Sequence, residues 1–206
     1  MKTLYLVRHG QTEWNAEQRM QGWLDSSLTD LGVRHAHAHA ELLAREAVER
    51  LVVSPLGRAR ETADIINARL NLPTRVDPRL KERSYGDWEG LTLDEIEKRW
   101  PGASAARRRD PFNYRPPGGE SLPDLVMRVA PLLDEVRGDG AERIAIVSHG
   151  MTGRALLAHV LELAPKVANT ARQPNDVVYR IELENGGCTC RHYRAGAGPF
   201  DGLFHG

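Results

Sequence analysis

Two stretches of the chain end in the same way. LYLVRHGQT, residues 4–12, is an apolar run that breaks off into a His-Gly step at His9, and IAIVSHGMT, residues 144–152, breaks off into the same step at His149. Continuous apolar runs of this length predict central β-strands that are covered on both faces. In open parallel sheets, ligands bind beyond the carboxyl ends of the strands. We therefore expect both histidines to face one pocket at that edge of the sheet.

Strand-like and helical segments alternate along most of the chain. Strands are expected at residues 3–8, 50–54, 73–77, 143–148, 177–183 and 189–194. Helices are expected at about 30–49 behind a Thr29 cap, after the cap Ser54 with Pro55 at the first helical position, at about 92–100, at about 121–136 and from about Thr152. Thr92 and Ser121 each precede an acidic residue at capping-box spacing. This order predicts an α/β fold: a mostly parallel doubly wound sheet of about six strands, with helices on both faces and an antiparallel edge near the C-terminus.

We interpret residues 1–206 as a single domain with one insertion. Residues 78–121 are rich in Arg, Pro and Gly and contain no clear strand, so we expect a helical lid beside the sheet. The glycine-rich residues from about 195 to 206 are expected to form a mobile tail.

Charge and composition exclude several classes of partner. Lys plus Arg equal Asp plus Glu at 28 each, so no net field attracts nucleic acid or a membrane surface. No segment has the roughly 18 consecutive apolar residues of a membrane span, and the N-terminus does not read as a signal peptide. Cys188 and Cys190 are the only cysteines and are poorly spaced for a disulfide. We expect a cytoplasmic protein, either a monomer or a homodimer.

Polar residues near both His-Gly steps describe an anion site. Arg8 precedes His9, Asn15 follows in the same loop, and Arg58 lies in the first turn of an expected helix. An arginine at a helix N-terminus combines a fork of donors with the positive end of the helix dipole, which suits a phosphate. Glu82, in LKERSYGDWEG (residues 80–90), is the carboxylate best placed to transfer a proton. These residues predict a pocket for a dianionic phosphoryl group.

The same motifs resemble those of the histidine phosphatase superfamily, also called phosphoglycerate mutase-like. The R-H-G-x-T signature stands at residues 8–12, followed by Asn15, Gln21 and Gly22, with SPLGRARETA at 54–63, LKERSYGDWEG at 80–90 and VSHG at 147–150. The resemblance covers residues 2 to about 161. Four motifs in the same order form a specific signal.

The resemblance implies a catalytic role for each matched residue. His9 resembles the nucleophile, which attacks phosphorus in line and becomes phosphohistidine. Arg8, Arg58 and His149 resemble the clamp on the phosphoryl oxygens. Glu82 resembles the general acid that protonates the leaving alkoxide and later activates water. No metal or other cofactor is implied, because arginine and imidazolium supply the positive charge.

The resemblance also implies a wider set of substrate-binding residues. The set is Asn15, Gln21, Gly22, Tyr85, Gly150, Met151, Arg108 and Arg109. The last two belong to an arginine run in the expected lid, where a solvated surface and a contact with an anionic substrate both remain open. Trp23 and Trp88 lie in loops around the same pocket and serve either its rim or packing.

Three histidines, His35, His37 and His39, stand on the first long expected helix. His35 and His39 have the i, i+4 spacing of a helical zinc pair. No third ligand is evident, so the pattern favours a solvated helix face.

Together the residues predict a metal-independent phosphomonoester hydrolase that acts through phosphohistidine on a small phosphorylated metabolite. The alternative inside the family is a phosphoglycerate mutase, which would use 2,3-bisphosphoglycerate. The short chain, Met151 where mutases have asparagine, and PPGGES at residues 116–121 favour the phosphatase. Glu82 and Tyr85 in LKERSYG look like the mutase version.

Two further classes are weaker readings. A catalytically inactive module that binds phosphorylated ligands is disfavoured, because every position expected to carry chemistry is filled. A dinucleotide-binding enzyme is disfavoured because no G-x-G-x-x-G follows the first expected strand.

Overall fold

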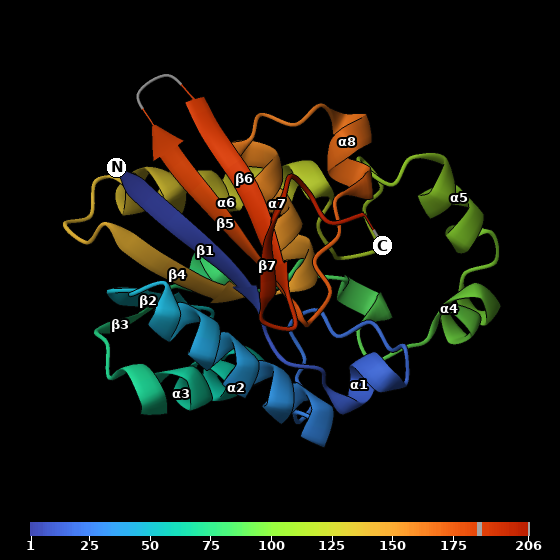
Figure 1. Cartoon of the computed structure of the whole chain (residues 1–206). Coiled ribbons are helices and arrows are strands. Elements are labelled where there is room, and N and C mark those ends of the chain that lie inside the picture. The colour runs from blue at the N-terminus through green and yellow to red at the C-terminus, as the bar shows by residue number, and fades with distance from the viewer. Residues whose placement is uncertain (185–186, 206) are drawn as a thin grey trace.

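A seven-stranded sheet in the order β3-β2-β4-β1-β5-β6-β7 runs through the computed structural model (Figure 1). The structure describes residues 1–184 and 187–205. The strands are β1 (Lys2–Arg8), β2 (Arg50–Val53), β3 (Thr74–Val76), β4 (Arg143–Ser148), β5 (Val177–Glu184), β6 (Gly187–Arg194) and β7 (Ala197–Asp201). The helices are α1 (Glu13–Ala16), α2 (Asp30–Arg45), α3 (Gly57–Leu70), α4 (Leu93–Arg99), α5 (Ala103–Arg109), α6 (Leu122–Arg137), α7 (Gly150–Val160) and α8 (Pro165–Thr170), with 3₁₀ turns η1 (Pro78–Leu80) and η2 (Gly86–Trp88).

The sheet has a parallel part and an antiparallel part, which meet at β1. β3, β2, β4 and β1 are parallel, whereas β5, β6 and β7 continue from β1 in antiparallel pairs. The α/β fold expected from the sequence is confirmed, and its antiparallel part comprises three strands. Arg8 of β1 lies opposite Ser148 of β4 in the parallel register. Each His-Gly step follows directly, so the two histidines leave adjacent strands at the same edge.

β1 is buried on both faces, as its apolar run predicts. Leu4 and Leu6 belong to a core cluster with residues of α6 and α7. Tyr5 and Val7 belong to a second cluster with residues of α2 and α3. Figure 1 shows α2 and α3 on one side of the sheet and α6 and α7 on the other. Burying alternate residues in different clusters holds β1 rigidly up to His9.

Three of the four expected helix caps are present, and the fourth differs. Thr29, Thr92 and Ser121 each accept a backbone N–H at the start of α2, α4 and α6, with capping boxes at the last two. Ser54 does not cap α3, which begins at Gly57 behind Leu56 with no side-chain cap. The Ser54 hydroxyl instead lies next to His149, because β2 ends beside β4.

A seventh strand stands where the sequence suggested a mobile tail. β7 pairs with β6, with His192 opposite Phe200. Gly196, at φ +80°, allows the chain to reverse after β6, and the free edge of β6 supplies hydrogen-bonding partners. Phe204 is buried beyond the strand, and its backbone N–H donates to the Tyr179 hydroxyl. Glycine therefore serves a hairpin here.

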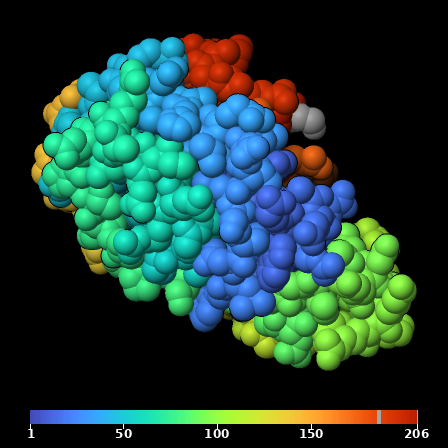
Figure 2. Space-filling view, turned by 90° about the horizontal axis from the view of Figure 1, so that it is seen from below, coloured from blue at the N-terminus to red at the C-terminus, as the bar shows by residue number. Residues whose placement is uncertain are grey.

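Residues 78–121 contain helices and no strand, as expected. The part around α4 and α5 forms a lobe at one end of the molecule, coloured lime green in Figure 2, next to the blue residues near the N-terminus. A small core cluster of Tyr85, Trp88, Ile96 and Ala103 holds this lobe, so Trp88 serves packing. No helix in the described ranges is long and apolar enough to cross a membrane.

Candidate active site

The structure brings the two histidines of the His-Gly steps together. The ring centroids of His9 and His149 lie 5.2 Å apart, with the ring planes inclined by 58°. Both residues are buried. The pairing expected from the echoed motifs is therefore present, at the carboxyl edge of β1 and β4.

The hydrogen bonds of His9 define its tautomer. Its Nδ1 lies 2.7 Å from the carbonyl oxygen of Gly10, which can only accept. We therefore assign the proton to Nδ1 and the lone pair to Nε2. The Arg58 Nε–H donates to that Nε2 at 3.3 Å. Burial, followed by the charges of Arg58 and Arg8, holds the pKa of His9 well below 6.5, so the imidazole is neutral.

The backbone around His9 is held by α2, α3 and the loop before β5. A Cβ at Gly10 would come within 2.2 Å of the Gly32 carbonyl oxygen, so only glycine allows this contact with the first turn of α2. The Gly10 N–H donates to the Thr62 hydroxyl of α3, and the Asn175 side chain donates to the His9 carbonyl. His9 thus has a fixed position.

His149 has its opposite ring nitrogen engaged. Its Nε2 lies 2.7 Å from the Ser54 hydroxyl oxygen, which already accepts from the Leu56 N–H. The Ser54 proton is free to be donated to Nε2, and we assign the ring proton to Nδ1, which is buried without a partner in the described part of the chain. Burial, then Arg58, lowers the pKa of His149 well below 6.5. We therefore treat the His149 imidazole as neutral in this structure, with Nδ1–H as its donor.

Arg58 is fixed along most of its guanidinium. Its side chain is 1% exposed and forms an ion pair with Asp25 at 2.6 Å. The Nη1 group also donates to the Leu24 carbonyl at 2.7 Å, and Nη2 donates to the Gly22 carbonyl at 2.8 Å. These bonds leave the Nε–H directed at His9.

Arg8 lies on the other side of the site. Its Nη1 donates to the Gln173 carbonyl at 2.9 Å, whereas its Nε is buried with no partner among the described residues. A Cβ at Gly150 would meet the Arg8 Cζ at 3.2 Å, so the second His-Gly step makes room for this guanidinium. Burial lowers the pKa of Arg8, and the Glu82 charge opposes that shift.

Glu82 is bound to the N-terminus of α7. Its carboxylate accepts the backbone N–H groups of Met151 and Thr152, each at 3.1 Å, and the Arg83 N–H at 2.7 Å. The start of a helix supplies such free N–H groups. The second His-Gly step therefore positions Glu82 as well as His149.

Two adjoining cavities meet at these residues. The smaller, about 160 Å³, is lined by Arg8, His9, Asn15, Arg19, Met20, Gln21, Gly22, Arg58, Glu82 and Tyr85. The larger, about 550 Å³, is lined by Arg8, Glu82, Tyr85, Gly150, Met151, Arg154, Arg172, Gln173, Pro174 and Asn175. Arg8, Glu82 and Tyr85 line both. Every predicted site residue except His149, Arg108 and Arg109 lines one of the two, and the His149 ring centroid lies 5.2 Å from that of His9.

Several residues around the cavities differ from the sequence-based set. Arg108 and Arg109 are exposed and line neither cavity. Arg107 is the member of the run whose charge acts on the buried Tyr85. Arg154 and Arg172 were missed. The sequence offered a signal for Arg154 alone: it follows His149 by five residues, about one turn along the helix that begins after the second His-Gly step.

The helix histidines form no metal site. Among residues 1–184 and 187–205, no group of three or more His, Cys, Asp and Glu side chains is arranged to hold a metal ion. The expectation of a solvated face is wrong for His39, which is 2% exposed with Nε2 2.9 Å from the Asn175 carbonyl. His37 is exposed as expected. α2 packs on the sheet along the His39 side.

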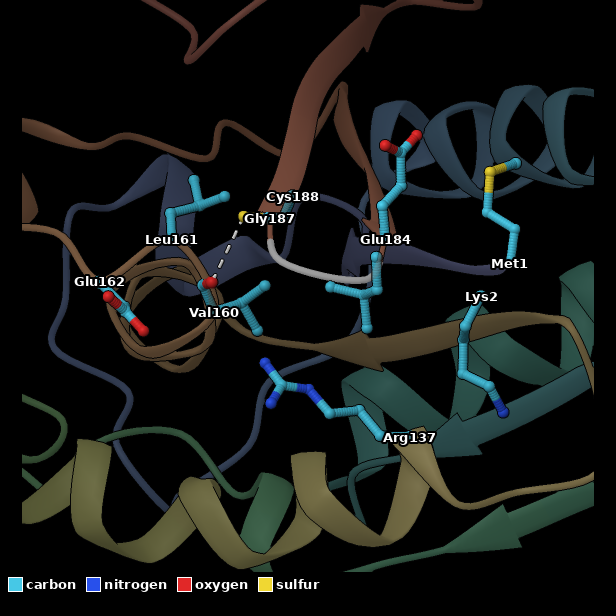
Figure 3. A pocket seen from close by; sticks show the side chains of 10 residues that line it. Met1, Lys2, Arg137, Val160, Leu161, Glu162, Glu184, Gly187 and Cys188 are labelled. Carbon is cyan, nitrogen blue, oxygen red and sulfur yellow. Dashed lines mark hydrogen bonds between the residues drawn. The ribbon is translucent and has the colours of Figure 1, made fainter.

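A larger cavity, about 710 Å³, lies at the other end of β1, away from the histidines. Figure 3 shows Leu161 and Cys188 on one side of it and Arg137 on the other. None of the sequence-predicted site residues lines it. Its size therefore does not make it the candidate site.

Comparisons with known proteins point to one family. Residues 4–196 match the family model described as histidine phosphatase superfamily (branch 1). The glucosyl-3-phosphoglycerate phosphatase of Mycolicibacterium vanbaalenii is 41% identical over 171 residues, which cover 79% of this chain and 76% of that protein. A 2,3-bisphosphoglycerate-dependent phosphoglycerate mutase of Methylobacterium sp. is 38% identical over 76% of this chain and 79% of that protein. A mycobacterial glucosyl-3-phosphoglycerate phosphatase solved with VO3 superposes with a TM-score of 0.80 at 35% identity, covering 88% of this chain and 91% of that one.

Proposed function

Because the chain belongs to the histidine phosphatase superfamily, we propose that it hydrolyses phosphomonoesters of a small metabolite through a phosphohistidine on His9. One observation carries the proposal. The Nδ1–H of His9 is bonded to the Gly10 carbonyl, so the lone pair on Nε2 is directed toward Arg58 in the smaller cavity. A neutral imidazole with an oriented lone pair, held in the resting protein only by the Arg58 Nε–H at 3.3 Å, is the arrangement that a phosphoryl acceptor needs.

In the first half-reaction, the Nε2–P bond forms as the ester P–O bond breaks. Protonated Glu82 gives its proton to the leaving oxygen. Glu82 lines both cavities, so its carboxyl group lies between a phosphoryl group near His9 and a leaving group in the larger cavity. In the second half-reaction, the Glu82 carboxylate takes a proton from water, which attacks phosphorus and returns the electron pair to Nε2.

Positive charge in the site comes from Arg8 and Arg58. As the His9 lone pair forms the bond to phosphorus, the Arg58 Nε–H loses its acceptor and becomes free for a phosphoryl oxygen. Further donors are the Arg8 Nε and the His149 Nδ1, which have no partner among residues 1–184 and 187–205. Fixed donors of this kind stabilise charge that develops in a transition state. We propose that these groups act without a metal ion or other cofactor.

The substrate proposal follows the names of the relatives. We propose glucosyl-3-phosphoglycerate and 3-phosphoglycerate as the first compounds to test, and a cytoplasmic location is consistent with the free thiols of Cys188 and Cys190. The second candidate function is phosphoglycerate mutase, which the 38% identity to a mutase favours. Incubation with 3-phosphoglycerate and 2,3-bisphosphoglycerate separates the two: a phosphatase releases inorganic phosphate, and a mutase forms 2-phosphoglycerate.

Rapid quench with a ³²P-labelled phosphomonoester tests the proposed function. We expect an acid-labile, base-stable phosphoryl group on the wild-type protein, with or without EDTA, and none on His9→Ala. A label that survives acid would point to a serine or threonine nucleophile and overturn the proposal. Absence of any label and of turnover would leave the inactive phospho-ligand-binding module.

A further inference from the structure

Two arginines that the proposed chemistry does not use line the larger cavity. Arg154 is on the second turn of α7, and Arg172 is in the loop between α8 and β5. Arg8 lines the same cavity. This side of the site therefore carries three cations, of which only Arg8 belongs to the proposed phosphoryl clamp.

Arg154 is oriented with its terminal nitrogens unused. Its Nε donates to the Ala171 carbonyl at 2.8 Å, which ties the guanidinium to the loop that carries Arg172. Its two Nη groups make no hydrogen bond within the described ranges. Burial is the main cause that lowers the pKa of Arg154, and the Tyr85 and Glu82 side chains oppose that shift. Arg107 and Arg172 lower it further, so the two cavity arginines lie close enough for their charges to interact.

Neither arginine has a carboxylate partner within residues 1–184 and 187–205. Some arginines elsewhere do have such partners: Arg79 pairs with Glu135 at 2.7 Å, and Arg128 pairs with Glu120 at 2.9 Å. Arg172 is exposed toward the cavity with no side-chain hydrogen bond among these residues. Unpaired guanidinium groups around a cavity of about 550 Å³ provide a site for an anion from outside the protein.

We propose that Arg154 and Arg172 bind a carboxylate on the leaving group of the substrate, and so select phosphomonoesters that carry one. The planar fork of guanidinium donors matches a carboxylate. Glu82 and Tyr85 separate this subsite from the smaller cavity, so the ester oxygen lies beside Glu82 when both ends are bound. The exposed Arg108 and Arg109 have no part in it. This inference rests on the proposed function, because it places the phosphoryl group at His9.

The closing experiment compares 3-phosphoglycerate with glycerol 3-phosphate, which has a hydroxymethyl group in place of the carboxylate. Binding is measured by calorimetry on His9→Ala protein, so that no turnover occurs, with Arg172 intact or changed to Gln. Because Arg172 is exposed, this change leaves the fold intact. We expect Arg172→Gln to weaken 3-phosphoglycerate binding about ten- to a hundredfold, the loss typical of a charged hydrogen bond, and to change glycerol 3-phosphate binding less than threefold.

Three further variants sharpen the result. Arg154→Gln should have the same selective effect, Arg172→Lys should retain part of the preference, and the exposed Arg69→Gln is the matched loss of charge elsewhere. Equal losses for both ligands, or none for either, would overturn the subsite. Turnover of p-nitrophenyl phosphate is measured separately on enzyme that retains His9. Because the leaving group of this substrate has no carboxylate, its turnover reports on the proposed function alone. Its absence together with selective binding would refute the function and leave the subsite standing.

Discussion

The two His-Gly steps share a sequence pattern and a place in the sheet, but they present opposite sides of the imidazole. His9 has its Nδ1–H bonded to a carbonyl and its Nε2 lone pair available. His149 has Nε2 engaged by Ser54 and its Nδ1 without a partner in the described ranges. In the proposed mechanism the first ring attacks and the second donates. The partner of each ring, the Gly10 carbonyl for His9 and the Ser54 hydroxyl for His149, sets which nitrogen faces outward.

The backbone N–H groups that follow the two His-Gly steps also have different acceptors. After His9, the Gly10 N–H donates to Thr62, a contact that holds the loop. After His149, the N–H groups of Met151 and Thr152 donate to Glu82. The first His-Gly step therefore supplies the proposed nucleophile, whereas the second supplies the proposed donor His149 and holds the proposed acid Glu82. The loss of activity caused by substitutions at the second loop should therefore depend more strongly on the leaving group of the substrate.

The largest expected effect is the loss of turnover in Glu82→Gln, which tests the role of the group held by the second loop. Glu82→Gln keeps most of the hydrogen bonding but cannot supply a proton. Turnover of alkyl phosphates should fall about a hundred- to ten-thousandfold, whereas the burst of phosphohistidine from p-nitrophenyl phosphate should fall far less, because phenolate leaves without a proton. Stopped-flow absorbance measures the burst.

Asp87→Asn is the control, since Asp87 is an exposed carboxylate in the same loop. Equal losses for both ester types in Glu82→Gln would remove Glu82 from the acid role and make Asp87 the next candidate.

His149→Ala should lower kcat about a hundredfold or more, the cost of removing one donor to developing charge. Its Nδ1–H contact should tighten as charge builds on the phosphoryl oxygens, so KM should change little. Steady-state kinetics on one alkyl ester, with exposed His37→Ala as the control, measures this. A rise in KM alone would make His149 a ground-state anchor.

We expect the free energy of unfolding to depend on pH through His39, whose ring contacts the Asn175 carbonyl beside the first loop. Burial is the main cause that lowers the pKa of His39 to about 4, against about 6.5 in an unfolded chain. As pH falls below 6.5, the unfolded chain takes up a proton that the folded protein does not. Between pH 7 and pH 5 this removes about 2 kcal/mol from the free energy of unfolding, roughly a thirtyfold change in the folding equilibrium.

Urea denaturation at both pH values tests the effect. Between pH 7 and pH 5, the free energy of unfolding should fall by about 2 kcal/mol less in His39→Asn than in the wild type. His37→Asn controls for the substitution itself. If the free energy of unfolding changed equally with pH in wild type and His39→Asn, the buried His39 imidazole would not contribute to the pH dependence of stability.

Ser54→Ala should have the smallest effect, about a fivefold loss in kcat, because one hydrogen bond that orients His149 is removed. A double-mutant cycle gives the decisive comparison. If Ser54 acts through His149, the double variant should match His149→Ala alone. Additive losses would mean that Ser54 serves another group.

The sequence predicted those parts of the molecule that depend on short-range patterns. The burial of β1 on both faces follows from its apolar run, and the caps at Thr29 and Thr92 follow from local hydrogen-bonding chemistry. The meeting of His9 and His149 follows from adjacent parallel strands. The burial and the caps are predicted from residues a few positions apart, whereas the meeting of the histidines also requires β1 to pair with β4, which their matching apolar runs indicate.

Features that depend on distant partners were not predictable in the same way. Ser54 has the chemistry of a cap, but a histidine from β4 takes its hydroxyl. His39 looks solvated until a carbonyl from residue 175 bonds it. Arg154 and Arg172 belong to the site only because the loop before β5 folds back over α7. In each case the partner is more than fifteen residues away, or on another element.

The two cavities share walls but differ in size, about 160 Å³ against about 550 Å³. In the proposed mechanism the alcohol departs as the Nε2–P bond forms, and we expect it to leave through the larger cavity and to admit the hydrolytic water there. Inorganic phosphate forms only in the second half-reaction, so we expect it to leave last, from the smaller cavity beside Arg8 and Arg58. Phosphate should therefore compete with substrate for the free enzyme, whereas an alcohol with its own high affinity for the roomier cavity would delay water and return the phosphoryl group to itself.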